Sequence, residues 1–275
     1  MKILVVGGTG MIGGHAALHL RSKGHQVTIS GRRAPTEVSA LVKLPFLQGN
    51  YLRGDITAEQ LALFEAVVFA AGSDVRHVPE GQGADEHYLQ ANGEAVPAFA
   101  RMAREAGVRI FVHVGSAYPH IVPEAVHSSP SRKLAADGVA ALATPTFHAC
   151  SLDPPIVVGT VPGMKIPMFE AYIQYAEGKL PIPSFAPAGA LNFISTQSLS
   201  EAIAGAIENS KTVSGRSILV GDENLTYAEY LETFFHAVGN QQKLPVSDQD
   251  HPLMPRATLY AGDMVVRYEP QMWQL

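Results

Sequence analysis

The sequence is poor in cysteine and in charge, and it lacks long apolar runs. Cys150 is the single cysteine of 275 residues, so an internal disulfide is excluded and a reducing compartment is favoured. Charged residues make up 16% of the chain, the net charge is −5 and no basic run occurs, which argues against nucleic acid or an anionic membrane as the main partner. No apolar stretch is long enough to cross a bilayer, and the first residues are typical of strand and turn rather than of a leader peptide. We therefore expect a cytoplasmic protein.

A metal-binding pattern is also missing. The eleven histidines are scattered and form neither a two-histidine helix motif nor a cluster with cysteine, so we expect no metal site. Cys150 lies in an apolar, strand-like run, which indicates a buried structural thiol rather than a nucleophile.

The most informative stretch runs from Lys2 to Gly14, with the sequence KILVVGGTGMIGG. Its apolar start is typical of a parallel strand that is covered on both faces, and helical apolar spacing begins after the glycines. Glycine turns also join strands to helices in proteins that bind nothing. A strand, a glycine-rich turn and a helix in this order nevertheless predict a dinucleotide site, because the backbone can approach a pyrophosphate and the helix N-terminus offers free N–H groups. The candidate contacts are Gly7, Thr9, Gly10, Met11, Ile12 and Gly13.

The second predicted strand, 26–30, is followed by Gly31, Arg32 and Arg33. An NAD site places an acidic residue at the end of this strand to accept hydrogen bonds from the ribose hydroxyls, and none is present here. Arginine binds a phosphate through a bidentate fork, so Arg32 and Arg33 favour the 2′-phosphate of NADP(H) over NAD(H). The alternative is a pair of solvated loop arginines.

Strands alternating with helices through residue 150 predict an α/β fold, a Rossmann-type doubly wound parallel sheet with right-handed crossovers. Ligands bind such sheets at the carboxyl ends of the strands, where Gly7, Arg32, Gly72 and Ser116 fall. His113 is expected to face a covering helix as a packed residue. The further predicted strands span 46–50, 66–71, 109–114, 146–152 and 217–220, and the helices span 58–65, 84–106, 132–143, 199–208 and 227–239, with caps at Thr57/Gln60, Ser198/Glu201 and Thr226/Glu229.

We expect residues 1–152 to form the NAD(P)-binding domain, completed by about 191–221. Residues 153–190 and 222–275 are expected to form a small C-terminal substrate lobe. Apolar and aromatic residues between 163 and 187 suit a small, fairly apolar carbonyl or alcohol substrate, but they would equally pack the lobe or form a homodimer contact. They are Met164, Met168, Phe169, Tyr172, Tyr175 and Phe185.

This order of motifs resembles the extended and atypical short-chain dehydrogenase/reductase superfamily, in particular its NAD(P)-dependent epimerase/dehydratase family. The resemblance covers most of the chain and includes the glycine turn, the fourth-strand end and the run from Asn92 to Ser116. It implies that Ser116 orients the substrate. Asp55 is open to two readings, as an acceptor for the adenine amine or as a surface aspartate beside a helix. The further cofactor contacts implied are Asp55, Ile56, Ala70, Ala71, Gly72, Asn92 and Lys133.

The chain departs from this family at its proton donor. The family has a Tyr-x-x-x-Lys pair after the serine, in which the tyrosine moves the proton and the lysine holds the nicotinamide ribose. Lys133 matches the lysine, but Ser129 stands at the tyrosine position. A serine hydroxyl cannot replace a phenol of pKa about 10, and losing a positioned general acid typically costs about 10²–10⁴-fold in rate.

Three alternatives follow from this departure. Tyr118 would be a relocated acid if the strand end stays extended, since it would then share a face with Ser116, although it would also serve as a packing aromatic; His120 and His127 lie in the same loop. Lys133 would itself act as acid or base, as in the isoflavone-reductase-like branch, if partial burial lowers its pKa. The third alternative is a non-catalytic NADP(H) sensor, as in the NmrA-like branch. We expect an NADP(H)-dependent oxidoreductase with Ser116, Tyr118 and Lys133 at its active site.

Overall fold

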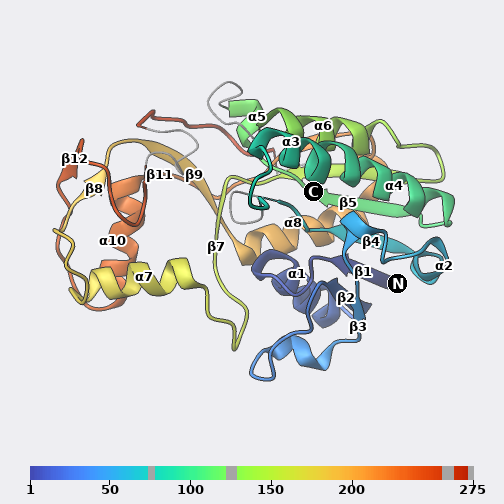
Figure 1. The fold of residues 1–275 in the computed structure, drawn as a ribbon, viewed down its shortest axis with the longest axis horizontal. Coiled ribbons are helices and arrows are strands. Elements are labelled where there is room, and N and C mark those ends of the chain that lie inside the picture. The colour runs from blue at the N-terminus through green and yellow to red at the C-terminus, as the bar shows by residue number, and fades with distance from the viewer. Residues whose placement is uncertain (74–77, 122–128, 256–262, 272–275) are drawn as a thin grey trace.

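The computed structural model describes residues 1–73, 78–121, 129–255 and 263–271. A seven-stranded parallel sheet in the order β10-β6-β5-β4-β1-β2-β3 forms its larger part (Figure 1). The strand order reverses between β1 and β4, as in a doubly wound sheet, so the predicted α/β fold class is confirmed. The strands are β1 (Lys2–Val6), β2 (Gln26–Gly31), β3 (Phe46–Gln48), β4 (Ala66–Phe69), β5 (Ile110–Val114), β6 (His148–Asp153) and β10 (Ser217–Leu219).

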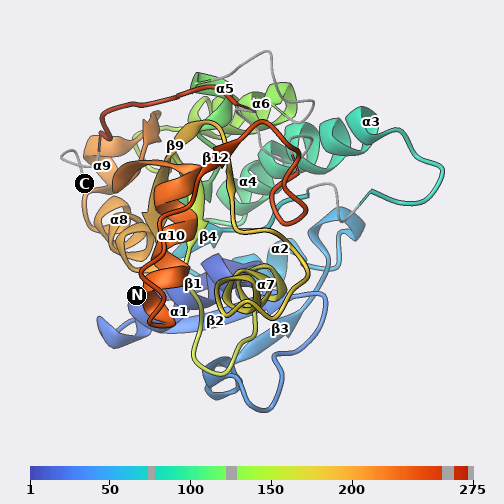
Figure 2. The same cartoon turned by 90° about the vertical axis from the view of Figure 1, so that its left-hand side faces the viewer.

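Helices cover both faces of this sheet (Figures 1 and 2). β1 is uniformly apolar because both of its faces are covered. Ile3 and Val5 pack under one helix layer, and Leu4 and Val6 pack under the other. The first layer contains α1 (Met11–Ser22), α8 (Thr196–Glu208) and the short α9 (Ser210–Val213). The second contains α2 (Ala58–Leu61), α3 (Ala84–Tyr88), a π-helical turn (Leu89–Glu94), α4 (Ala95–Glu105) and α6 (Ser129–Ala140). Two 3₁₀ turns, Ala40–Lys43 and Tyr51–Arg53, flank β3.

A smaller unit lies beside the sheet, at the left of Figure 1. Its central strand β9 (Ala190–Ser195) is antiparallel to β11 (Glu223–Thr226) and parallel to β7 (Ile156–Val158). The other elements are β8 (Ala186–Pro187), β12 (Val246–Ser247), α7 (Pro167–Ala176) and α10 (Tyr227–Ala237). The short α5 (Tyr118–Ile121) follows β5 and contacts α6.

Aromatic side chains form the core of the smaller unit. Phe169, Tyr172 and Tyr175 are buried there against α10, and the Tyr175 hydroxyl donates to the Phe185 carbonyl oxygen at 2.7 Å. Of the two methionines in the same stretch, Met168 is exposed and Met164 packs against the core under α1 and α8. The aromatic residues that suggested an apolar substrate are therefore used largely for packing.

Most helix caps follow the sequence pattern, with one correction. Thr57 with Gln60 and Thr226 with Glu229 both form capping boxes. The cap predicted at Ser198 is wrong, because β9 runs straight into α8 and the extended Ser195 accepts from the Ser198 N–H at 3.0 Å. The helix therefore begins at Thr196, three residues before the predicted start.

Buried polar groups occupy the carboxyl half of β5 and β6. His113 is on the face covered by α4 and α6, as predicted, but it is also hydrogen-bonded: its Nδ1 lies 3.0 Å from the Ser151 hydroxyl. Burial lowers the pKa of His113 to about 4. Cys150, on the opposite face, is a buried free thiol. Burial raises the pKa of this thiol to about 12, so it stays protonated at neutral pH.

The pKa of His113 predicts a loss of stability in acid. The unfolded chain protonates this histidine near its ordinary pKa of 6.5, whereas the folded protein resists protonation down to about 4. Protons therefore bind preferentially to the unfolded state as the pH falls between these values, and His113 should remove about 3 kcal/mol of the free energy of unfolding across that window. Urea unfolding at pH 7.5 and pH 4.5 measures this loss.

The matched variant is His113→Gln, which keeps a hydrogen-bonding group beside Ser151 but does not titrate in this range. Its acid destabilisation should be clearly smaller than that of the wild type. His236→Gln, at an exposed position on α10, controls for removing a histidine as such. Equal pH dependence in wild type and His113→Gln would contradict the assignment.

Candidate functional site

The glycine turn after β1 is packed too closely to admit side chains. Gly7 has a φ of +81°, and a Cβ at Gly13 would lie 2.5 Å from the Gly7 carbonyl oxygen. A Cβ at Gly7 would lie 2.7 Å from the Ala71 nitrogen and 2.8 Å from the Ala70 carbonyl oxygen. The turn is therefore in close contact with both the start of α1 and the end of β4. Glycine is required at positions 7 and 13 as a result.

The N-terminus of α1 is left open by this turn. Gly10 is the N-cap and offers no side-chain acceptor, and no acidic residue lies in the first helical turn. The N–H groups of Met11, Ile12 and Gly13 consequently face the turn without an intrahelical partner, next to the positive end of the helix dipole. An anion such as a pyrophosphate matches this arrangement.

The end of β2 borders the same turn. Gly7 and Gly8 both donate their N–H groups to the Ser30 carbonyl oxygen, at 2.9 and 3.0 Å. A Cβ at Gly31 would lie 2.4 Å from the Thr9 hydroxyl, so Thr9 covers the strand end. Arg32 and Arg33 follow directly and are exposed, and the ion pairs formed within the described ranges involve neither guanidinium.

The end of β4 is held in place by buried hydrogen bonds. Asn92, in the π-helical turn, accepts from the Ser73 N–H at 3.0 Å and donates to the Ser73 carbonyl oxygen at 3.2 Å. The Ser73 hydroxyl lies 2.5 Å from Nε2 of His87. Ser73 and His87 were not identified from the sequence, because nothing in their spacing indicates that α3 folds back over the end of β4.

The predicted adenine contacts are less accessible. Ile56 is 1% exposed and packs in the core under α4, so only its backbone can border a site. The carboxylate of Asp55 is at the surface and accepts from the Asn50 N–H at 2.9 Å, which braces its own loop.

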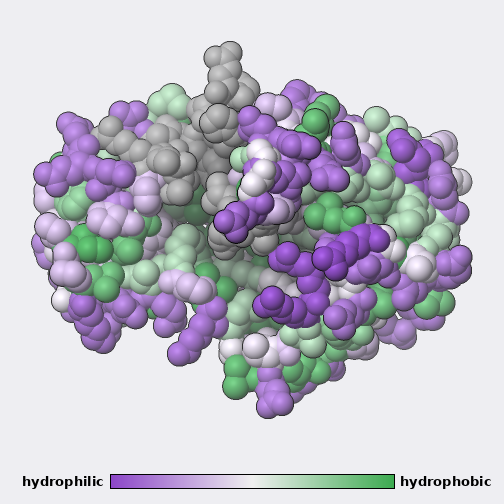
Figure 3. Space-filling view, in the orientation of Figure 1, coloured by the Kyte–Doolittle hydropathy of each residue, from purple (hydrophilic) through white to green (hydrophobic). Residues whose placement is uncertain are grey.

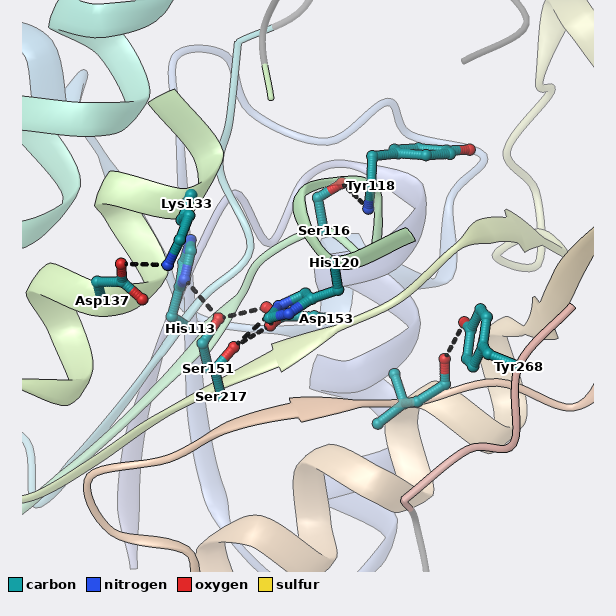
Figure 4. Close-up of polar contacts among 11 residues, drawn as sticks. His113, Ser116, Tyr118, His120, Lys133, Asp137, Ser151, Asp153, Ser217 and Tyr268 are labelled. Atoms are coloured by element: carbon teal, nitrogen blue, oxygen red, sulfur yellow. Dashed lines mark hydrogen bonds and ion pairs between the residues drawn. The ribbon is translucent and has the colours of Figure 1, made fainter. Parts of the chain in front are cut away.

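Ser116 lies just beyond the end of β5, but Tyr118 does not share its face. The chain does not stay extended: it turns into α5 at Tyr118, whose N–H donates to the Ser116 hydroxyl at 3.4 Å. The Tyr118 ring extends away from this hydroxyl (Figure 4) and is buried in the aromatic core of the smaller unit. The extended geometry on which its role as proton donor depended is thus wrong, and the packing alternative describes its position. His127 lies outside the described residues.

α6 presents Lys133 and Arg132 in different directions. Lys133 Nζ lies 2.6 Å from Asp137 on the same helix, and its side chain is 59% exposed, so the partial burial expected of a lysine acid or base is absent. Arg132 instead donates to the Ser73 carbonyl oxygen at 3.3 Å, and a Cβ at Gly72 would lie 3.4 Å from its Nη1. Of these two neighbouring cations, Arg132 is the one that contacts the end of β4.

A buried carboxylate anchors α5 to the sheet (Figure 4). Asp153 is fully buried and accepts from the Ser151 hydroxyl at 2.6 Å, from the Ser217 hydroxyl, and from Nε2 of His120 at 2.9 Å. Burying a carboxylate is costly unless donors surround it, and these three donors offset that cost. Because His120 is on α5, the network holds the turn that contains Ser116.

These groups lie along one edge of the sheet. In the strand register Val6 pairs with Ser30 and with Phe69, and Phe69 pairs with His113, so the residues that follow these strands meet at their carboxyl ends. On the face shown in Figure 3, a recess separates this part of the molecule from the smaller unit. The described ranges contain no group of histidine, cysteine and carboxylate side chains arranged for a metal ion, and no helix in them is long and apolar enough to cross a membrane.

Together, the open helix N-terminus and the glycine turn at the topological switch point define a Rossmann-type dinucleotide-binding fold. Residues 3–138 match the NAD dependent epimerase/dehydratase family. A UDP-glucose 4-epimerase of Klebsiella pneumoniae is 30% identical over 127 residues, which cover 42% of this chain and 90% of that protein. A UDP-glucose 4-epimerase of Neisseria meningitidis is 29% identical over 126 residues, or 42% of this chain and 37% of that protein. The chain belongs to the NAD dependent epimerase/dehydratase family.

Solved structures share the fold. The UDP-glucose-4-epimerase of Stenotrophomonas maltophila, with bound NAD and formylated UDP-arabinopyranose, superposes with a TM-score of 0.73 at 20% identity, covering 98% of this chain and 94% of that one. The Bordetella bronchiseptica enzyme WbmG in complex with NAD gives a TM-score of 0.70 at 16% identity, covering 100% and 86% of the two chains.

The close approach at Gly13 predicts a selective effect of an added methyl group. Gly13→Ala should destabilise the protein by about 1–3 kcal/mol, because its Cβ would meet the Gly7 backbone. Gly10→Ala is the matched control, since its Cβ would lie 3.4 Å from the Gly7 carbonyl oxygen, an ordinary contact. Thermal unfolding without added cofactor measures both. Equal effects of the two substitutions would contradict the close-packed turn.

Proposed function

We propose that this protein binds NADP(H) in preference to NAD(H) and uses it to interconvert an alcohol and a carbonyl group in a small-molecule substrate. The observation that supports the cofactor preference most directly is the end of β2. There, Arg32 and Arg33 are exposed beside the glycine turn, and no carboxylate stands at the strand end.

The cofactor would be held by this chain's backbone and by its basic side chains. The free N–H groups of Met11, Ile12 and Gly13 suit the pyrophosphate, and the Arg32 and Arg33 guanidiniums suit a 2′-phosphate. When bound, the nicotinamide ring supplies or accepts a hydride. NAD remains the alternative cofactor, because the Stenotrophomonas and Bordetella neighbours hold NAD.

The substrate would lie between Ser116 and the smaller unit, with the Ser116 hydroxyl bonded to the reacting oxygen. The sequence favoured a fairly apolar carbonyl compound, but the aromatic residues behind that argument mostly fill the core of the smaller unit. The curated relatives are UDP-glucose 4-epimerases, so sugar nucleotides belong in the first substrate panel together with simple ketones and aldehydes.

A non-catalytic NADP(H) sensor is the second candidate. Position 129 is serine, and Lys133 is paired with Asp137 instead of turning toward the strand ends. In this proposal neither residue of the family's proton-transfer pair would be in place. A sensor would bind the cofactor tightly and turn over no substrate.

The cofactor proposal predicts at least about tenfold tighter binding of NADPH than of NADH, because each arginine–phosphate bond is charge-assisted. Titration calorimetry on the purified protein measures both affinities. Replacing Arg32 and Arg33 together by serine should remove the preference by weakening NADPH alone. Arg53→Ser, at an exposed position after β3, is the control. Equal or tighter binding of NADH by the wild type would overturn the preference.

Turnover separates the two candidates. An enzyme should oxidise NADPH with a carbonyl compound of the panel, reduce NADP+ with an alcohol, or convert a sugar nucleotide into its epimer with no net change in the cofactor. Ser116→Ala should lower that rate by about 10²-fold or more while NADPH affinity changes little. Absence of turnover throughout the panel, with tight NADPH binding, would favour the sensor. Full activity in Ser116→Ala would remove Ser116 from the reaction.

A further inference from the structure

We propose that Arg132 is the cation that contacts the bound dinucleotide where it passes the end of β4, at the place that the sequence pattern assigns to Lys133. This inference rests on the proposed dinucleotide binding. It concerns the half of the cofactor beyond the pyrophosphate, which Arg32 and Arg33 do not reach in the proposed arrangement.

The first support is the position of the guanidinium. A Cβ at Gly72 would lie 3.4 Å from Nη1 and 4.0 Å from Nη2 of Arg132, so the guanidinium lies directly against this glycine. Its Nη2 donates to the Ser73 carbonyl oxygen at 3.3 Å, and Ser73 is itself fixed by Asn92. These contacts therefore hold the guanidinium at the end of β4.

The second support is the continuity between this guanidinium and the glycine turn. Gly7 abuts Ala70 and Ala71, and Gly72 is the next residue along the chain. A ligand whose pyrophosphate lies on the turn must extend along this strand end, and there it meets Gly72 and Arg132.

The third support is electrostatic. Within the described part of the chain the ion pairs leave Arg132 without a carboxylate, so its charge can act on an anionic ligand.

Helix geometry explains why Arg132 and Lys133 differ. Ala135, Ala136 and Val139 face the protein interior, and Arg132 projects between the first two of these on the helical wheel. Lys133 is rotated by about 100° from Arg132, toward Asp137 and solvent. A guanidinium also offers several fixed N–H donors, so one can bond Ser73 while others bond ribose hydroxyls or phosphate oxygens.

The test compares two ligands on four proteins. NADPH spans the whole site, whereas adenosine 2′,5′-bisphosphate has the adenosine and 2′-phosphate but lacks the nicotinamide half. Arg132→Gln should weaken NADPH by about 10- to 100-fold and leave the bisphosphate within about twofold, because only NADPH reaches Arg132. Lys133→Gln should weaken NADPH much less than Arg132→Gln does. Arg101→Gln, at an exposed position on α4, is the matched control.

The other outcomes of these titrations overturn either the role of Arg132 or the proposed function. The proposal is overturned if Arg132→Gln binds NADPH like the wild type, if Lys133→Gln shows the larger loss, or if Arg132→Gln weakens both ligands equally, which is the signature of a purely structural role. Wild-type protein that binds neither NADPH nor NADH overturns the proposed function itself. If the wild type prefers NADH, only the preference for the phosphorylated cofactor fails, and Arg132 is judged by the same series with NADH and adenosine 5′-monophosphate. Circular dichroism melts confirm that each variant is folded.

Discussion

The glycine turn can form only because its backbone lies in close contact with the start of α1 and the end of β4. Gly13 approaches the Gly7 carbonyl oxygen, and Gly7 approaches the backbone of Ala70 and Ala71, in each case too closely for a side chain. These contacts bring α1, β1 and β4 together at the point where the strand order reverses. The open helix N-terminus, the arginines after β2 and the end of β4 border the same edge as a result.

Buried polar groups stabilise this edge from behind. Asn92 in the π-helical turn fixes Ser73, and Asp153 with His120 fixes α5 after Ser116. π-Helical turns are frequently found at functional sites. In this protein the turn directs the buried Asn92 amide to the backbone of Ser73, just beyond the end of β4.

On α6 the structure differs from the arrangement that the family resemblance implies. Serine stands at position 129, Lys133 pairs with Asp137, and Arg132 contacts the strand end instead. The family relationship therefore identifies the cofactor-binding fold more directly than it identifies a reaction, because fold alone does not determine chemistry. The side chains that would carry an activity in this protein are therefore a matter for the substrate and variant tests and do not follow from the family pattern.

The fold class, most of the strands and the glycine turn could be predicted from the sequence, because they depend on local apolar runs, on hydrophobic periodicity and on the conformations open to glycine. The sequence also indicated two of the three helix caps, whose hydrogen bonds join residues close in the chain. Three features became visible only in the folded chain. Tyr118 packs in the smaller unit, Arg132 and not Lys133 contacts Gly72, and Asp153 accepts hydrogen bonds from His120, Ser151 and Ser217. The physical reason is that each of these depends on the rotation of a helix or on contacts between distant segments, and local sequence patterns contain neither.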